Sequence, residues 1–211
     1  MLALLDSGER NRAARFHFER DRDAFIASHG WLRTLLGRYL NADPRRIDFI
    51  FGHHGKPAID GAPVHFNLSH SGEMAACAVT RDCEVGIDIE RVRPTSDIES
   101  IAERFFHPEE CRKLFGLAEE ERALAFFRCW TRKEAYIKAL GAGLSAPLDS
   151  FAVTLAPEEP AAFVQIDGQP AEGSLTQAAA ACSLFDLEAG PDYAGAVAIR
   201  GSKWALLSLQ D

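Results

Sequence analysis

One stretch decides how this chain folds: Trp130-Thr131-Arg132-Lys133-Glu134-Ala135-Tyr136-Ile137-Lys138. At 100° per residue it continues an apolar helix stripe made of Phe126, Phe127, Trp130, Ile137 and Leu140. Lys133 and Glu134 fall inside that stripe, and Lys138 falls at its edge. A buried carboxylate is costly unless it has a partner, so either a lysine neutralises Glu134 or Glu134 faces a cleft and binds a cation.

A simpler interpretation of this helix is an ion pair between Glu134 and Lys138, four residues apart. Such a pair contributes only ~0.2–0.5 kcal/mol on a helix surface. It accounts for the spacing of the two residues but not for their place on the apolar stripe. Both interpretations stay open at this point.

A second stretch, Glu84-Val85-Gly86-Ile87-Asp88-Ile89-Glu90, has the alternation of a strand. Asp88 and Glu90 lie two residues apart and therefore on the same face. Mg²⁺ prefers oxygen ligands and commonly keeps waters or substrate phosphates in its other positions. The two carboxylates could hold such an ion, with Glu134 completing the site from the helix. The alternative is a half-exposed strand with a polar outer face.

Composition places the chain among ordinary globular proteins. It has 211 residues, of which 47% are hydrophobic and 26% charged, enough for one domain or two small halves with a packed core. We expect no membrane segment, because no stretch approaches the ~20 apolar residues that a span needs. The five scattered cysteines lack zinc-ligand or C-x-x-C spacing, so we expect reduced thiols in the cytoplasm.

Charge is distributed unevenly along the chain. The formal net charge of −8 argues against a general nucleic-acid binder. Residues 1–46 nevertheless contain nine arginines and six acidic residues, a net of +3, so the rest of the chain carries −11. Guanidinium groups bind phosphate oxygens in a forked geometry, so this segment suits a small ligand with several phosphates. The alternative is a solvated helix face.

Periodicity and turn residues predict mixed secondary structure. Helical patterns cover residues 10–40, 97–106, 108–115 and 119–140, the last ended by Gly141 and Gly143. Strand patterns cover residues 65–68, 74–80, 85–90, 151–155, 161–166, 180–187 and 194–199. Hairpins next to long helices indicate the α+β class.

Two further segments contain groups that could bind phosphate. Phe66-Asn67-Leu68-Ser69-His70-Ser71-Gly72 predicts a turn, 69–72, with two hydroxyls, an imidazole and a glycine. These groups could cradle a phosphate, although a lone histidine near a strand end is more often structural. Gly55-Lys56-Pro57 is by itself only a turn with a lysine in it.

Taken in order, the segments 55–57, 66–72, 86–90 and 130–138 resemble the 4'-phosphopantetheinyl transferase superfamily. The resemblance is to its monomeric, Sfp-type branch and not to the short trimeric holo-carrier-protein synthases. It runs from about residue 10 to residue 155. Flanking matches at Gly141-Ala142-Gly143-Leu144 and Pro147-Leu148-Asp149-Ser150-Phe151 strengthen it.

The resemblance implies two pseudo-symmetric α+β halves, each a small, mostly antiparallel sheet packed against a long helix. Residues 1–83 would contact the phosphates and adenine of coenzyme A, and residues 84–211 would hold the metal and dock the carrier protein, near Phe115 and Leu117. The implied reaction is Mg²⁺-dependent transfer of phosphopantetheine from coenzyme A to a serine hydroxyl of an apo acyl or peptidyl carrier protein. Adenosine 3',5'-bisphosphate would be released.

The resemblance also implies roles for single residues. Asp88, Glu90 and Glu134 would hold Mg²⁺, and Glu134 or a metal-bound water would deprotonate the serine. Lys138 would contact the pyrophosphate and stabilise the leaving group. The remaining contacts to coenzyme A would come from Arg10, Arg12, Lys56, Ser69 and His70. Lys133 would support the acidic cluster electrostatically.

In two respects the sequence departs from the family pattern. Relatives usually begin with a longer segment that supplies a first strand, so either that strand is absent or the true start lies upstream. The first helix also lacks the usual Arg and Thr phosphate contacts, and we assign no phosphate role to Ala24, Phe25, Ser28 or His29.

Two other functions compete with the transferase. One is a non-catalytic module of the same fold that binds coenzyme A or a carrier protein. The other is an unrelated metal-dependent phosphohydrolase that uses the same three acids. We expect a cytoplasmic monomer with no nucleic-acid or membrane partner.

Overall fold

The computed structural model describes residues 1–143, 146–164, 179, 181–201 and 204–209. Its helices are α1 (Ser7–Ala13), α2 (Glu19–Leu40), α3 (Ile98–Phe105), α4 (Pro108–Gly116) and α5 (Glu119–Leu140). Its strands are β1 (Ile50–Phe51), β2 (Pro57–Ala58), β3 (His65–Ser71), β4 (Met74–Thr80), β5 (Val85–Arg91), β6 (Ala152–Val153), β7 (Phe163–Val164), β8 (Cys182–Asp186) and β9 (Tyr193–Arg200). Short 3₁₀ turns lie at Leu2–Leu4, Pro44–Arg46 and Leu148–Ser150.

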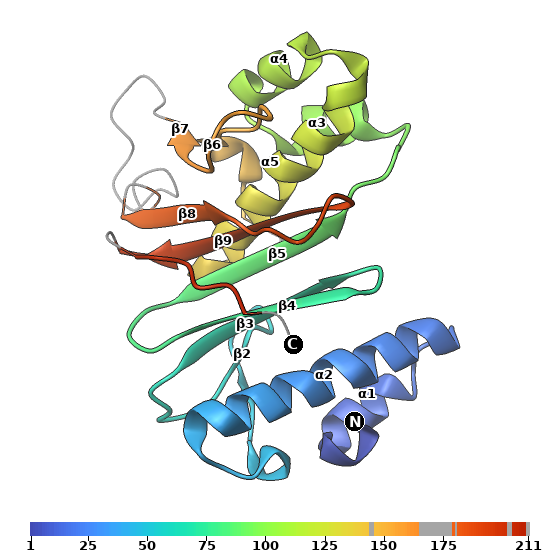
Figure 1. The fold of residues 1–211 in the computed structure, drawn as a ribbon, viewed down its shortest axis with the longest axis vertical. Helices are drawn as coiled ribbons and strands as arrows, with labels where there is room; N and C mark the ends of the chain where they lie inside the picture. Colours follow the sequence, from blue (N-terminus) through green and yellow to red (C-terminus); the bar gives the residue numbers. More distant parts are fainter. Residues whose placement is uncertain (144–145, 165–178, 180, 202–203, 210–211) are drawn as a thin grey trace.

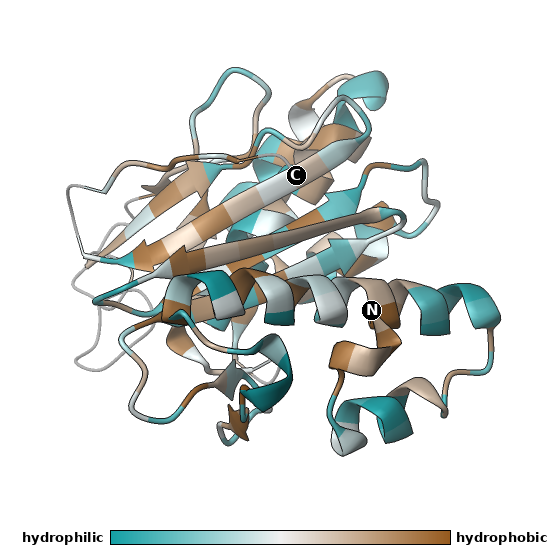
Figure 2. Ribbon diagram, turned by 60° about the horizontal axis from the view of Figure 1, so that its bottom comes forward, coloured by the Kyte–Doolittle hydropathy of each residue, from teal (hydrophilic) through white to brown (hydrophobic). Residues whose placement is uncertain are grey.

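The predicted α+β class is confirmed. The antiparallel β3–β4 hairpin packs against α2, and the antiparallel sheet β5-β9-β8 packs against α5. Figure 1 shows the two halves stacked, with the long strands between α1 and α2 on one side and α3, α4 and α5 on the other. Figure 2 shows hydrophilic first turns on α1 and α2, whereas the long strands carry mostly hydrophobic stretches. Within the described residues, no helix is long and apolar enough to cross a membrane.

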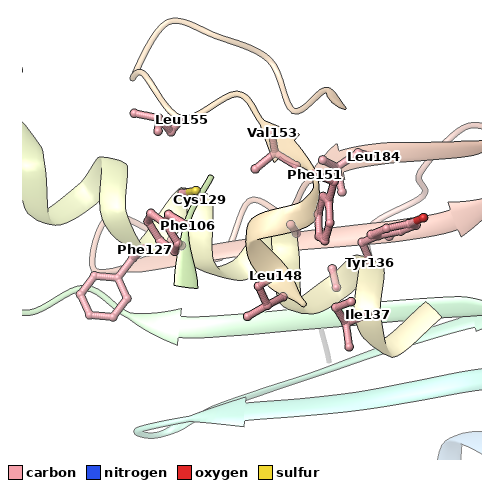
Figure 3. Close-up of a cluster of buried hydrophobic side chains, with 14 of the residues drawn as sticks. Phe106, Phe127, Cys129, Tyr136, Ile137, Leu148, Phe151, Val153, Leu155 and Leu184 are labelled. Carbon is pink, nitrogen blue, oxygen red and sulfur yellow. The ribbon is translucent and has the colours of Figure 1, made fainter. Parts of the chain in front are cut away.

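The second half has the larger core. Buried side chains of α5, including Tyr136 and Ile137, pack with Phe151, Val153 and Leu184 (Figure 3). The approach of α5 to β5 requires a glycine at position 86. A Cβ there would lie 2.1 Å from the carbonyl oxygen of Ala135 and 2.3 Å from the amide nitrogen of Ala139. The strand residues that follow Gly86 on the same face, Asp88 and Glu90, therefore lie against the same helix.

The predictions for the three later helices and for the strand at 85–90 agree with α3, α4, α5 and β5 to within one or two residues. Helix α5 ends where predicted, because Gly141 adopts the left-handed conformation with φ 63°. The strand predicted at 151–155 is shorter, as β6, and the strand predicted at 161–166 begins only at Phe163, as β7. Residues 165, 166 and 180 of the predicted strands lie outside the described residues.

The single helix predicted over residues 10–40 is wrong, because the chain forms two helices with a break between Ala13 and Glu19. Asp6 and Glu9 form a capping box at the start of α1. The break lets Leu5 and Ala13 pack with Phe25 in one buried cluster. In one straight helix the last two would lie about 18 Å apart, because each residue adds about 1.5 Å.

The turn predicted at 69–72 is also wrong. Strand β3 continues to Ser71, which pairs with Met74, so only Gly72 and Glu73 form the loop. Gly72 has a φ of 60°, which suits glycine at the tip of a two-residue hairpin. Ser69, His70 and Ser71 are therefore strand residues whose side chains alternate between the two faces.

Candidate active site

Asp88 lies at the centre of the candidate site, on β5 beneath α5, and is only 4% exposed. Its Oδ1 atom accepts a hydrogen bond from Lys138 Nζ at 2.6 Å and another from Ser69 Oγ at 3.0 Å. Its Oδ2 atom is buried and has no hydrogen-bond partner among the described residues. Burial raises the pKa of Asp88 even though the Lys138 ammonium acts to lower it.

Glu134 faces the same space from α5. Its side chain is buried, and its Oε1 atom has no hydrogen-bond partner among the described residues. Burial raises the pKa of Glu134 to about 7, and the negative charges of Asp88 and Glu90 add to the effect while Lys138 opposes it. Lys138 makes its 2.6 Å ion pair with Asp88. The simple helix pair between Glu134 and Lys138 therefore does not describe this site.

Glu90, the third predicted acid, is half-buried at the edge of the cluster. Its Oε2 atom accepts a hydrogen bond from Ser71 Oγ at 2.7 Å. The structure thus brings Asp88, Glu90, Glu134 and Lys138 to one place, with the serines of β3 beside them.

The described residues contain no group of three or more histidine, cysteine, aspartate or glutamate side chains already gathered as a metal site. The three acids are therefore not preassembled around an ion. Their chemistry nevertheless fits Mg²⁺, which prefers oxygen ligands. Within the described part of the chain, Asp88 Oδ2 and Glu134 Oε1 are buried acceptors without donors, one on a strand and the other on the facing helix. A cation between them would remove the cost of leaving both atoms unpaired.

Basic side chains from both halves act on His70. Loss of surrounding water lowers the pKa of His70, and the neighbouring His29, Lys138 and Arg12 lower it further while Glu90 opposes them. Groups from α1, α2, β3 and α5 therefore act on one another here. Several positive groups around one place favour binding of a polyanion.

His29 is a residue of this basic group for which the sequence indicated no role. The His29 ring stacks on the Phe25 ring with 3.9 Å between centroids. The Arg12 guanidinium lies 5.1 Å from the centre of the Phe25 ring. The Nδ1 atom of His29 is 2.9 Å from Glu9 Oε1, and Arg33 Nε donates to the other Glu9 oxygen at 2.6 Å. The spacing of four residues between Phe25 and His29 could have indicated a shared helix face.

Arg10 and Lys56 make bonds within the protein. Arg10 Nε donates to the carbonyl oxygen of Leu5 at 2.9 Å, next to the start of α1. Lys56 Nζ donates to Glu84 Oε2 at 2.6 Å and to the carbonyl oxygen of Val85 at 3.0 Å. Lys56 thus links the loop before β2 to the start of β5.

Lys133 does not lie in the acidic cluster, so the prediction that it supports those acids is wrong. It is fully buried on the other side of α5, where its Nζ atom lies 2.6 Å from Glu110 Oε2 and donates to the carbonyl oxygen of Phe151 at 2.6 Å. Successive helix residues point about 100° apart, which sends Lys133 into the core and Glu134 to β5.

Comparisons with known proteins agree with this arrangement. The family model "4'-phosphopantetheinyl transferase superfamily" matches residues 84–197, and the model "4'-phosphopantetheinyl transferase, N-terminal" matches residues 1–82. The chain is 41% identical over 208 residues to 4'-phosphopantetheinyl transferase HetI of a Nostoc species, covering 97% of this chain and 82% of that protein. It is 33% identical over 197 residues to 4'-phosphopantetheinyl transferase Sfp of Bacillus subtilis, covering 93% and 82%.

Among solved structures, the Chronobacterium ammoniagenes ACPS-CoA complex overlaps 57% of this chain and 98% of that chain, with 21% identity and a TM-score of 0.38. This partial overlap adds nothing to the sequence matches, on which the assignment rests. By those matches, the chain belongs to the 4'-phosphopantetheinyl transferase superfamily, in its Sfp-type branch, and is a 4'-phosphopantetheinyl transferase.

Proposed function

We propose that this enzyme takes the phosphopantetheine group from coenzyme A and transfers it, with Mg²⁺, to a serine hydroxyl of an apo acyl or peptidyl carrier protein. The serine oxygen forms a bond to the phosphorus that carries pantetheine. The P–O bond from that phosphorus to the rest of the pyrophosphate breaks, and adenosine 3',5'-bisphosphate leaves.

One observation carries this proposal. Asp88 Oδ2 and Glu134 Oε1 are buried carboxylate oxygens that no donor among the described residues reaches, and the Lys138 ammonium pairs with the other oxygen of Asp88. Two such atoms are unusual in a folded interior, where buried polar groups are nearly always hydrogen-bonded. Asp88, Glu90 and Glu134 would hold Mg²⁺, which when bound neutralises pyrophosphate charge.

The protein's own groups supply the remaining steps. Glu134 accepts the proton of the carrier serine. In the metal-free protein burial raises the pKa of Glu134 to about 7, and bound Mg²⁺ would lower it. Lys138 stands next to Asp88 and stabilises the charge on the departing phosphate. Because both side chains are largely covered, their electrostatic effects exceed those in open water.

Coenzyme A binding falls to the basic side of the site. Arg12, Ser69 and His70 contact its phosphates, with Arg10 close to the start of the same helix. Support comes from the positive charges that act on His70. Lys56 lies near the adenine of coenzyme A. The aliphatic part of its side chain packs against the adenine while Glu84 fixes its ammonium group.

The two halves of the chain have different roles in this reaction. Residues 1–83 supply the phosphate and adenine contacts, and residues 84–211 supply the acids and the docking surface for the carrier protein. Phe115 and Leu117 are only partly buried against the second core, which leaves part of each side chain available to a partner.

We further propose that the enzyme works as a monomer in the cytoplasm, because one chain contributes both the basic and the acidic side chains. All five cysteines are free, as expected in a reducing compartment.

To test the proposal, several apo carrier proteins are incubated with enzyme, coenzyme A and Mg²⁺ and are then weighed by mass spectrometry. A phosphopantetheine adduct on a carrier is the expected result. Binding of coenzyme A without any adduct would favour the non-catalytic module instead. Phosphate release from coenzyme A without a carrier would favour the phosphohydrolase.

A further inference from the structure

Strands β3 and β5 lie side by side (Figure 1) but belong to different sheets. Side chains join them in place of a backbone ladder. Three backbone N–H groups of β5 donate to side chains of β3: Ile87 to Asn67 Oδ1 at 2.9 Å, Ile89 to Ser69 Oγ at 3.3 Å, and Arg91 to Ser71 Oγ at 3.1 Å. The partners are always 20 residues apart, so the two strands run in the same direction.

The two serines of this series do more than accept. Ser69 Oγ also donates to Asp88 Oδ1 at 3.0 Å, and Ser71 Oγ donates to Glu90 Oε2 at 2.7 Å. Each hydroxyl therefore accepts a bond from the backbone N–H of one β5 residue. It donates to the carboxylate of the β5 residue that directly precedes that N–H. A hydroxyl is suited to this because it accepts and donates at once.

Asn67 shows the contrast within the same series. It accepts the N–H of Ile87, but the preceding residue on β5 is Gly86, which has no side chain to receive a bond. Serine therefore occurs at the two β3 positions whose β5 partner follows an acidic residue. Asparagine occurs at the one position whose β5 partner follows a glycine.

We propose that Ser71 is a positioning residue for Glu90, as Ser69 is for Asp88. Each hydroxyl fixes one carboxylate oxygen and so orients the acid toward the metal. The second bond of the hydroxyl, from a β5 backbone amide, holds the hydroxyl itself in place where β3 meets β5. This inference rests on the proposed metal site. Ser71 gives the cleaner test, because Ser69 is also a proposed phosphate contact and lies 3.4 Å from Lys138 Nζ.

The experiment compares Ser71→Ala with Asn67→Ala as the matched control, since both lose an acceptor for a β5 amide but only the first loses a bond to an acid. Mn²⁺ binding is measured by electron paramagnetic resonance with coenzyme A present and carrier protein absent, after subtraction of coenzyme A alone. The Mg²⁺ concentration for half-maximal transfer and the KM for coenzyme A are measured in parallel. Ser71→Thr, which keeps the hydroxyl, tests for rescue.

Ser71→Ala should weaken Mn²⁺ binding about 10-fold, as is typical for groups that orient metal ligands. It should raise the half-saturating Mg²⁺ concentration similarly and leave the KM for coenzyme A unchanged. Asn67→Ala should leave Mn²⁺ affinity unchanged, and Ser71→Thr should restore it.

Two results would overturn the inference while the transferase proposal survives. One is wild-type Mn²⁺ affinity in Ser71→Ala, and the other is equal weakening in Ser71→Ala and Asn67→Ala, which would make the bonds purely structural. If the wild-type enzyme bound no Mn²⁺, the metal site itself would be refuted and this inference with it.

Discussion

Replacing Lys133 with methionine should destabilise the fold and leave the chemistry intact, although Lys133 is the direct neighbour of the proposed base. Lys133 is fully buried and pairs with Glu110, which is 2% exposed. The substitution keeps the length of the side chain but removes the ammonium group. The carboxylate of Glu110 then remains buried without its counter-charge.

The size of the stability loss depends on the hydrogen bonds that Glu110 retains in the variant. Removing one partner of a buried ion pair typically costs about 3–5 kcal/mol. Glu110 would retain two backbone donors, the amides of His107 at 2.8 Å and Val153 at 2.7 Å, so we expect the lower end, about 3 kcal/mol. For a chain of this size, that loss corresponds to a fall in Tm of about 6–12 °C.

Urea unfolding of the variant should show a lower midpoint with an unchanged slope. Combining Lys133→Met with Glu110→Gln should recover part of the loss, because the side chain left in the core is then neutral. Transfer activity, assayed well below the lowered Tm, should stay within about 3-fold of wild type, since an interaction outside the site adds little to the barrier.

Either of two results would refute this reasoning. A stability loss below about 1 kcal/mol would mean that the buried pair has little energetic weight. A folded variant with transfer reduced more than about 100-fold would make Lys133 part of the catalytic machinery.

Three further predictions concern the site itself. The pKa of Glu134 is raised from 4.5 to about 7 by folding, so the wild-type protein loses stability as the pH rises through this window. In metal-free urea unfolding, Glu134→Gln should therefore gain about 3 kcal/mol relative to wild type between pH 4 and pH 8, and a pH-independent difference would contradict the assignment. Asp88→Asn should abolish transfer while circular dichroism shows an intact fold; near-normal turnover at low Mg²⁺ would remove Asp88 from the metal site. His70→Ala should raise the KM for coenzyme A about 10-fold, as loss of a charge-assisted bond predicts, and an unchanged KM would exclude a phosphate contact.

Local patterns predicted the elements that carry the acids. Strand alternation placed Asp88 and Glu90 on one face of β5, and helical periodicity with Gly141 gave α5 its bounds. These features depend on residues close in sequence, which constrain one another directly. The charges of Glu134 and Lys138 on an apolar stripe signalled the site because burying charge is costly.

Features that depend on distant residues could not be predicted in this way. The partner of Lys133 is 23 residues upstream, and nothing near it in the sequence indicates whether it faces the acids or the core. The break between α1 and α2 depends on Leu5 and Ala13 packing against Phe25. The bonds from the β3 serines to the β5 acids join residues 19 positions apart, on strands of different sheets.

We propose above all that Glu134, with Mg²⁺, drives the transfer of phosphopantetheine to a carrier serine. The most direct measurement is the mass of an apo carrier protein after incubation with coenzyme A, Mg²⁺ and either wild-type enzyme or Glu134→Gln, with a chelated reaction beside them. We predict the phosphopantetheine adduct only with wild-type enzyme and free Mg²⁺. An adduct formed at a comparable rate by Glu134→Gln, or by wild-type enzyme with the metal chelated, would contradict the claim.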